Sequence, residues 1–195
     1  MDRFRSAGGV GVAALAAALL LAGCMKSAPT RHYTLLALAP APTPGRATEH
    51  TLGIGPLRLP QHLRQAALVR RVSAYRVTYG DFDIWADPLE DRLVEVLMEN
   101  LGRLTGARRV LRYPWRVGEA PDRQISLEIT AFELAQDGRA ELAARWEIRD
   151  AHGTLLEAGE TSQREPANGE IGALAEALSR AVLGLSQDLS AAVAR

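Results

Sequence analysis

Two stretches of alternating apolar and polar residues, joined by a short turn, constrain the fold of this chain most strongly. Apolar residues occupy every second position over 125–131 and again over 140–148, and Asp137 and Gly138 lie between the two stretches. A period of two is that of a β-strand with one buried face, and an Asp-Gly pair is frequent in hairpin turns. The pattern predicts an antiparallel hairpin with one buried and one solvated face.

A first helix is predicted from Asp87 to Leu104. Asp87 is a favourable N-cap, Pro88 suits the first helical position, and Glu90 lies three residues after the cap, where it can bond back to it. Leucine and valine then recur at three- and four-residue spacings, which predicts one apolar face. Gly106 lies just beyond, where a left-handed residue often ends a helix.

A second helix is predicted from Glu170 to Ala194, because apolar residues again recur every three or four positions. A helix that lies on a membrane surface would carry basic residues on its polar face and bulky aromatic residues on the other. This segment has only Arg180 and Arg195 as basic residues and no aromatic residue. Packing of its apolar stripe against a sheet is therefore favoured.

Shorter stretches have the composition of further strands. Residues 51–60 contain Gly53, Gly55 and Pro56, which predict a short strand with a bulge or at a sheet edge. The other short strands are predicted at 67–72, 75–80, 108–113 and 154–161. Together these elements predict a single α+β domain, with a mainly antiparallel or mixed sheet and the two long helices packed on one face.

The N-terminus has the pattern of a secretory signal. Arg3 and Arg5 precede an apolar run over 10–22, and this run would rise only about 20 Å as a helix, short of the roughly 30 Å of a bilayer core. The run ends in "LAGC", which resembles the lipobox of bacterial lipoproteins. The resemblance implies that residues 1–23 are removed and that Cys24 becomes the N-terminus, with an S-diacylglycerol and an N-acyl group. The alternatives are a retained membrane span and a buried structural cysteine.

A linker is predicted between this anchor and the domain, so that residues 24–50 precede a domain at 51–195. Pro40, Pro42 and Pro44 alternate with small residues and favour an extended, semi-rigid chain. Residues 33–38 have strand composition and could dock as an outlying strand. Met25 stands where an Asp would imply inner-membrane retention of a lipoprotein. The resemblance therefore implies the periplasmic face of the outer membrane.

Composition and motifs argue against several function classes. The chain has 23 basic and 23 acidic side chains, so it lacks the basic excess of a nucleic-acid-binding protein. Its four histidines are scattered, and its single cysteine excludes an intramolecular disulfide. The sequence contains neither a phosphate-binding loop nor a nucleophile elbow. We therefore expect no enzymatic activity, no cofactor and no metal site.

Four segments of the chain resemble the ABC-transport auxiliary lipoproteins, a PqiC-like family that accompanies MCE-domain transport systems. They read "LRLPQHL", "FDIWADPLEDRL", "VLRYPW" and "ISLEITAFELAQDGRAELAARWEI". His62 stands in the first segment where an aromatic residue is expected. The resemblance implies a periplasm-facing lipoprotein that works with an MCE-domain protein and with an ABC permease and ATPase, which would supply the energy for lipid transport. A homo-oligomer is left open.

Two function classes remain. The first is a docking component of an intermembrane lipid-transport system, and the second is a structural or outer-membrane assembly lipoprotein without a transport role. The candidate partner contacts are Trp85, Trp115 and His62, because tryptophan is enriched at interface hot spots. Trp85 could equally pack against the helix that follows it, and packing is favoured for Trp85 and for Trp146.

Overall fold

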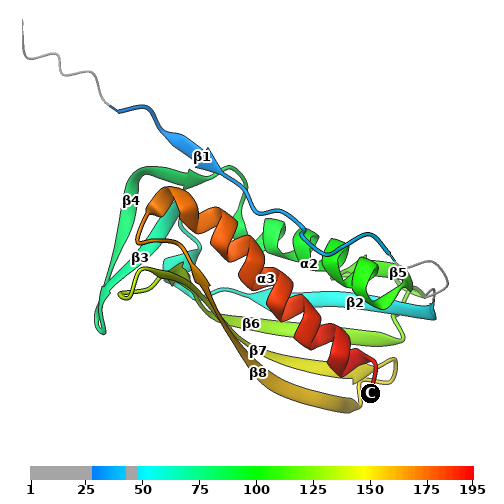
Figure 1. Ribbon diagram of the computed structural model, residues 1–195. Coiled ribbons are helices and arrows are strands. Elements are labelled where there is room, and N and C mark those ends of the chain that lie inside the picture. The colour runs from blue at the N-terminus through cyan, green and yellow to red at the C-terminus, as the bar shows by residue number, and fades with distance from the viewer. Residues whose placement is uncertain (1–27, 43–47) are drawn as a thin grey trace, which may run out of the picture.

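Both long helices lie on the same face of one eight-stranded sheet (Figure 1). The structure is a computed structural model that describes residues 28–42 and 48–195. Its strands are β1 (Arg31–Tyr33), β2 (Thr48–Arg58), β3 (Ala67–Ser73), β4 (Arg76–Trp85), β5 (Ala107–Arg112), β6 (Arg123–Leu134), β7 (Arg139–Asp150) and β8 (Leu155–Pro166). Its helices are the short 3-10 helix η1 (Gln61–Leu63), α2 (Leu89–Thr105) and α3 (Ile171–Val193). The predicted α+β class and single domain are confirmed.

The sheet is mixed. The predicted hairpin is β6 and β7, and β8 continues it as a second antiparallel neighbour of β7. The meander of β3 and β4 is also antiparallel. In contrast, β2 runs parallel to both β5 and β6, β1 runs parallel to β4, and the end of β6 runs parallel to β3. The mixed alternative therefore describes this sheet, although its longest ladders are antiparallel.

Strand β2 is longer than predicted and lies inside the sheet. It pairs with β5 on one side and with β6 on the other, so the expected edge position is wrong. The expected bulge is present, because the register against β6 shifts between Ile54 and Leu57. Close packing explains the glycine at position 53, since a Cβ there would come within 2.5 Å of Pro121 and 2.8 Å of Trp115. Local glycine and proline content could not reveal two neighbours that lie over 50 residues away in sequence.

A bulge in β6 changes which residues face the helices. The register against β7 shifts between Ile129 and Ala131, so the strict alternation predicted over 125–131 does not continue through Ala131. Ala131 is only half-buried, whereas Phe132 and Leu134 are fully buried. The extra residue of the bulge moves the apolar face by one position.

Helix α2 begins two residues later than predicted, and Asp87 does not cap it. Pro88 occupies the cap position with an extended backbone and no side-chain cap bond, and its carbonyl accepts the first helical hydrogen bond from the Arg92 amide at 3.1 Å. The Ala86 amide donates to the carbonyl of Tyr33 at 2.8 Å, which ties the chain to β1 just after β4, and residues 86–87 form a bend before the helix. The predicted end is confirmed, since Gly106 is left-handed with φ 67°.

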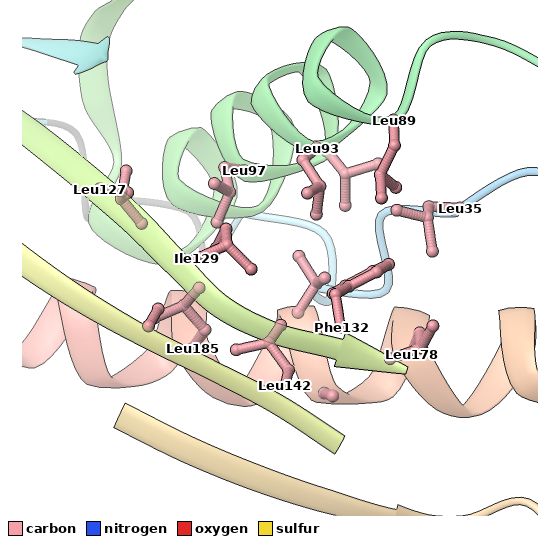
Figure 2. Packing of buried hydrophobic residues seen from close by; sticks show 14 of the residues in the cluster. Leu35, Leu89, Leu93, Leu97, Leu127, Ile129, Phe132, Leu142, Leu178 and Leu185 are labelled. Atoms are coloured by element: carbon pink, nitrogen blue, oxygen red, sulfur yellow. The ribbon is translucent and has the colours of Figure 1, made fainter. Parts of the chain in front are cut away.

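The core lies between the inner face of the sheet and the two helices (Figure 2). Leu93 and Leu97 of α2 and Leu178 and Leu185 of α3 are fully buried there. Trp146 of β7 is also buried, as predicted, and its indole nitrogen donates to the Thr161 hydroxyl at 3.2 Å. The helices thus cover the apolar face that the alternating strands create.

Candidate docking and anchoring site

Residues 34–42, which we call the strap, cross the helix pair on its side away from the sheet (Figure 1). Two arginines of α2 hold its backbone. Arg92 donates to the Leu35 carbonyl at 2.9 and 2.6 Å, and Arg103 donates to the Ala39 carbonyl at 2.9 Å. Leu35 is fully buried (Figure 2), so the strap is part of the packed fold. A domain that starts at residue 51 would leave out this segment.

Buried polar side chains between the helices bind the strap from below. Asn100 of α2 is fully buried; its Oδ1 accepts from the Ala39 amide at 2.9 Å and its Nδ2 donates to the Ser186 hydroxyl at 3.2 Å. Ser179 of α3 accepts from the Leu36 amide at 3.1 Å. These bonds satisfy strap amides that would otherwise be buried without partners, and they fix the position of the strap along both helices.

Strand β1 joins the strap to the sheet through one carboxylate. Asp83 of β4 accepts from the Arg31 guanidinium at 2.8 Å and from the Tyr33 hydroxyl at 2.9 Å. Burial and the hydrogen bond to Asp83 raise the pKa of Tyr33, and the hydrogen bond from its side chain to Asp83 raises the pKa of Arg31. The chain that leads from Cys24 is therefore clamped at its entry into the domain. Cys24 itself lies outside the described residues.

Trp85 is only 7% exposed, with its ring 6.0 Å from that of Phe132. It also lines a hollow of about 460 Å³ at the start of α2, together with Leu59, Arg64 and Pro88. Trp85 is thus mainly a core residue, and the exposed residues that line the hollow are Arg64, Gln65, Ala66, Ala86, Asp87 and Pro88. His62 lies in η1, between Leu59 and Arg64, and its Nε2 is enclosed without a hydrogen-bond partner.

Trp115 lies apart from these two residues. It packs against Gly53 in β2 and meets the ring of Tyr113 edge-on at 5.3 Å. The structure therefore places Trp85 at this hollow, His62 in η1 between two residues that line it, and Trp115 against β2 and Tyr113. A role of these three residues in partner binding stays a prediction.

A second hollow, of about 610 Å³, lies on the outer face of the sheet, away from the helices. Arg145 of β7 donates to Glu160 of β8 at 2.9 Å, and this bond raises the pKa of Arg145. Arg58, Glu128 and Glu147 complete its charged lining. A charged and open surface of this kind suits polar protein segments better than lipid tails.

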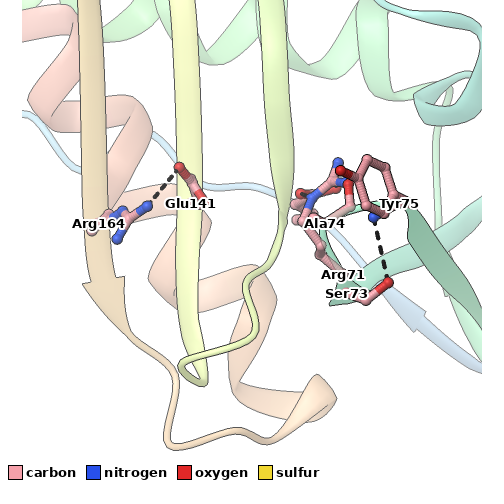
Figure 3. Close-up of polar contacts among 7 residues, drawn as sticks. Arg71, Ser73, Ala74, Tyr75, Glu141 and Arg164 are labelled. Carbon is pink, nitrogen blue, oxygen red and sulfur yellow. Dashed lines mark hydrogen bonds and ion pairs between the residues drawn. The ribbon is translucent and has the colours of Figure 1, made fainter.

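The β3–β4 turn and the end of the β6–β7 hairpin carry a further set of polar contacts (Figure 3). Arg71 of β3 pairs with Glu133 of β6, which is 1% exposed, and Arg71 also donates to the Ala74 carbonyl at 3.5 Å. Arg164 of β8 donates to Glu141 of β7 at 3.1 Å. The first pair fixes the β3–β4 hairpin to the central strand β6.

Sequence reasoning did not identify the residues that hold the strap. A signal for them is present, because Asn100, Ser179 and Ser186 interrupt otherwise apolar helix faces. A short polar residue inside an apolar stripe needs a hydrogen-bond partner from outside its own helix face.

Among residues 28–42 and 48–195, no group of histidine, cysteine or acidic side chains could hold a metal ion. In the same part of the chain, no helix is both long and apolar enough to span a bilayer.

Comparison with known proteins identifies the family. The family model described as "ABC-type transport auxiliary lipoprotein component" matches residues 33–190, from the end of β1 into α3. The chain belongs to this family. The match starts at Tyr33, so it includes the strap as well as the sheet and helices. The transport role of such auxiliary lipoproteins is non-enzymatic, and this chain is a membrane-transport-associated lipoprotein of that class.

Relatives and solved structures agree with this assignment. The intermembrane transport lipoprotein PqiC of Escherichia coli K12 is 26% identical over 132 residues, which cover 67% of this chain and 69% of PqiC, and PqiC of Shigella flexneri gives the same values. The crystal structure of protein XCC0632 from Xanthomonas campestris superposes with a TM-score of 0.70 at 14% identity, covering 83% of this chain and 93% of that one. This chain and XCC0632 thus share a fold at low sequence identity.

Proposed function

We propose that this chain is an outer-membrane-anchored periplasmic lipoprotein that acts as a docking component of an MCE/ABC-type intermembrane lipid transport system. The match of residues 33–190 to the transport auxiliary lipoproteins carries the proposal. The "LAGC" sequence supports lipidation at Cys24, and Met25 supports sorting to the outer membrane. The relative's description as an intermembrane transport lipoprotein supports a role between two membranes.

The strap supports a docking role that depends on a fixed position. Because the strap is hydrogen-bonded along two helices, a lipid anchor at Cys24 would hold the folded domain close to the membrane. The partners in this proposal are an MCE-domain protein and the ABC permease and ATPase of the same system. Energy from ATP hydrolysis would enter through the ATPase.

Fractionation and capture test the two parts of the proposal separately. Intact mass spectrometry of the membrane-extracted protein should show a triacylated N-terminus at Cys24, and the protein should float with outer-membrane fractions. Cys24→Ala should abolish both results. MCE and ABC subunits should copurify with the wild-type chain after crosslinking. Lipidation without these subunits would instead favour a structural or assembly role.

The hollow beside Trp85 is the proposed contact surface, and its rim offers a matched pair of charge variants. Arg64 is exposed at this hollow, whereas Arg108 is exposed on β5, where it lies 3.6 Å from Glu49. Arg64→Glu should reduce capture of the MCE-domain protein, and Arg108→Glu should not. If both variants capture the MCE-domain protein equally well, the contact lies on another surface, such as that around Trp115.

A further inference from the structure

The turn of the β3–β4 hairpin exposes an aromatic side chain completely. Tyr75 is 101% exposed relative to a reference residue, and its amide donates to the Ser73 hydroxyl at 3.4 Å. Two more aromatic residues on β4, Tyr79 and Phe82, are 44% and 38% exposed. One projecting hairpin thus carries three accessible aromatic side chains, with the most exposed of them at its turn.

This hairpin lies beside the entry of the anchored chain. β1 pairs with β4 in the register Arg31 to Asp83, and the hairpin projects on the side of the molecule where the chain enters through β1 (Figure 1). Seven residue steps lead from Cys24 to Arg31, with a maximum length of about 25 Å. Seven residue steps along β4 also lead from Arg76 to Asp83 and span at most about 23 Å. A bilayer that holds Cys24 is thus within reach of the hairpin turn.

The chemistry of the turn matches a bilayer surface. Tyrosine has an apolar ring and a polar hydroxyl, and it is enriched at the level of the lipid headgroups. Arg76, also exposed, follows Tyr75 directly and can pair with lipid phosphate. The Arg71–Glu133 pair holds the hairpin against β6, and the Arg71 bond to the Ala74 carbonyl shapes its turn. Arg71, Ala74 and Tyr75 lie together at this turn (Figure 3).

From these observations we infer that Tyr75 and Arg76, at the β3–β4 turn, form a second membrane contact in the headgroup layer of the bilayer that holds the Cys24 lipid. The inference rests on the proposed lipid anchor. The anchor keeps the turn at high local concentration beside the bilayer, so even a weak contact is occupied. Two contacts orient the domain, where the anchor alone would only tether it.

The test couples the mature chain, residues 24–195, through its single cysteine to a maleimide phospholipid. The vesicles contain phosphatidylethanolamine and phosphatidylglycerol, with or without brominated phosphatidylcholine as a tryptophan quencher. Tyr75→Trp reports on the turn, and Val117→Trp is the matched control, because Val117 is 106% exposed on a different loop. The parent chain gives the background emission of Trp85, Trp115 and Trp146.

We expect brominated lipid to reduce the added emission of Tyr75→Trp about twofold and to leave that of Val117→Trp unchanged. If neither added tryptophan is quenched, the turn faces water or a protein and the inference is overturned. Equal quenching of both would also overturn it, because the domain would then have no fixed orientation. Since the lipid is attached chemically, these results do not depend on whether cells lipidate Cys24, which mass spectrometry decides separately.

Discussion

The two faces of the sheet differ in the side chains that they carry. The inner face carries leucine, isoleucine and phenylalanine side chains that α2 and α3 cover completely, and almost every polar side chain there has a partner. The outer face carries charged side chains in neighbouring pairs around an open hollow. Burial of apolar area stabilises the fold, whereas exposed ion pairs contribute little. The inner face should therefore set stability, and the outer face is free to serve recognition.

The largest expected effect is on the inner face. Phe132 is 2% exposed and packs against Trp85, so Phe132→Ala leaves a cavity and should lower the free energy of unfolding by about 3–5 kcal/mol. Urea unfolding followed by circular dichroism measures this. Tyr75→Ala removes a fully exposed aromatic residue and should change the same quantity by no more than about 0.5 kcal/mol. If the two variants lost similar amounts of unfolding free energy, the inner face would not be the main source of stability.

A smaller loss is expected from the polar residue inside the helix layer. Asn100→Ala leaves the Ala39 amide without its acceptor and should cost about 1–3 kcal/mol of unfolding free energy. The strap amides at Leu36 and Ala39 should also exchange hydrogen faster. Gln187→Ala, exposed on α3 next to Ser186, is the control. Unchanged exchange at the strap in Asn100→Ala would show that the strap does not depend on this side chain.

The outer face should tolerate the loss of an ion pair. Arg145 and its partner Glu160 are both exposed, so Arg145→Ala should leave the urea midpoint almost unchanged at physiological salt. A large shift would mean that the outer face also contributes to stability. The same variant then tests recognition, because any loss of partner capture could not be attributed to unfolding.

The smallest effect is a titration shift on the outer strand. The hydrogen bond from Arg195 lowers the pKa of Glu157, although desolvation opposes it. A lowered pKa in the folded state gives stability that is present above the ordinary carboxyl pKa and lost as pH falls through the lowered value. Arg195→Ala should return the pKa of Glu157 toward its ordinary value in a carboxyl NMR titration. The pKa of Asp150, lowered by the Thr154 amide, should not move.

Prediction from sequence succeeded where the pattern is local. The β6–β7 hairpin, the apolar faces of α2 and α3 and the left-handed Gly106 each follow from residues close together in the chain. It failed at β2 and at the start of α2. The neighbours of β2 are β5 and β6, and the position of Asp87 depends on the Ala86 bond to Tyr33. Such contacts join distant segments and leave no periodic trace in sequence.

The sequence by itself determined the β6–β7 hairpin, the two long helices and the α+β class, because periodicity and turn residues are properties of short segments. The lipoprotein signal at Cys24 stays a prediction from sequence. Only the tertiary structure decided that the sheet is mixed, that the bulge at Ile129 brings Phe132 to the inner face, and that the strap belongs to the fold. Each of these depends on hydrogen bonds between segments far apart in the chain. The free energy of such a bond depends on whether its donor and acceptor are buried, and their burial is decided by the packing of the whole domain.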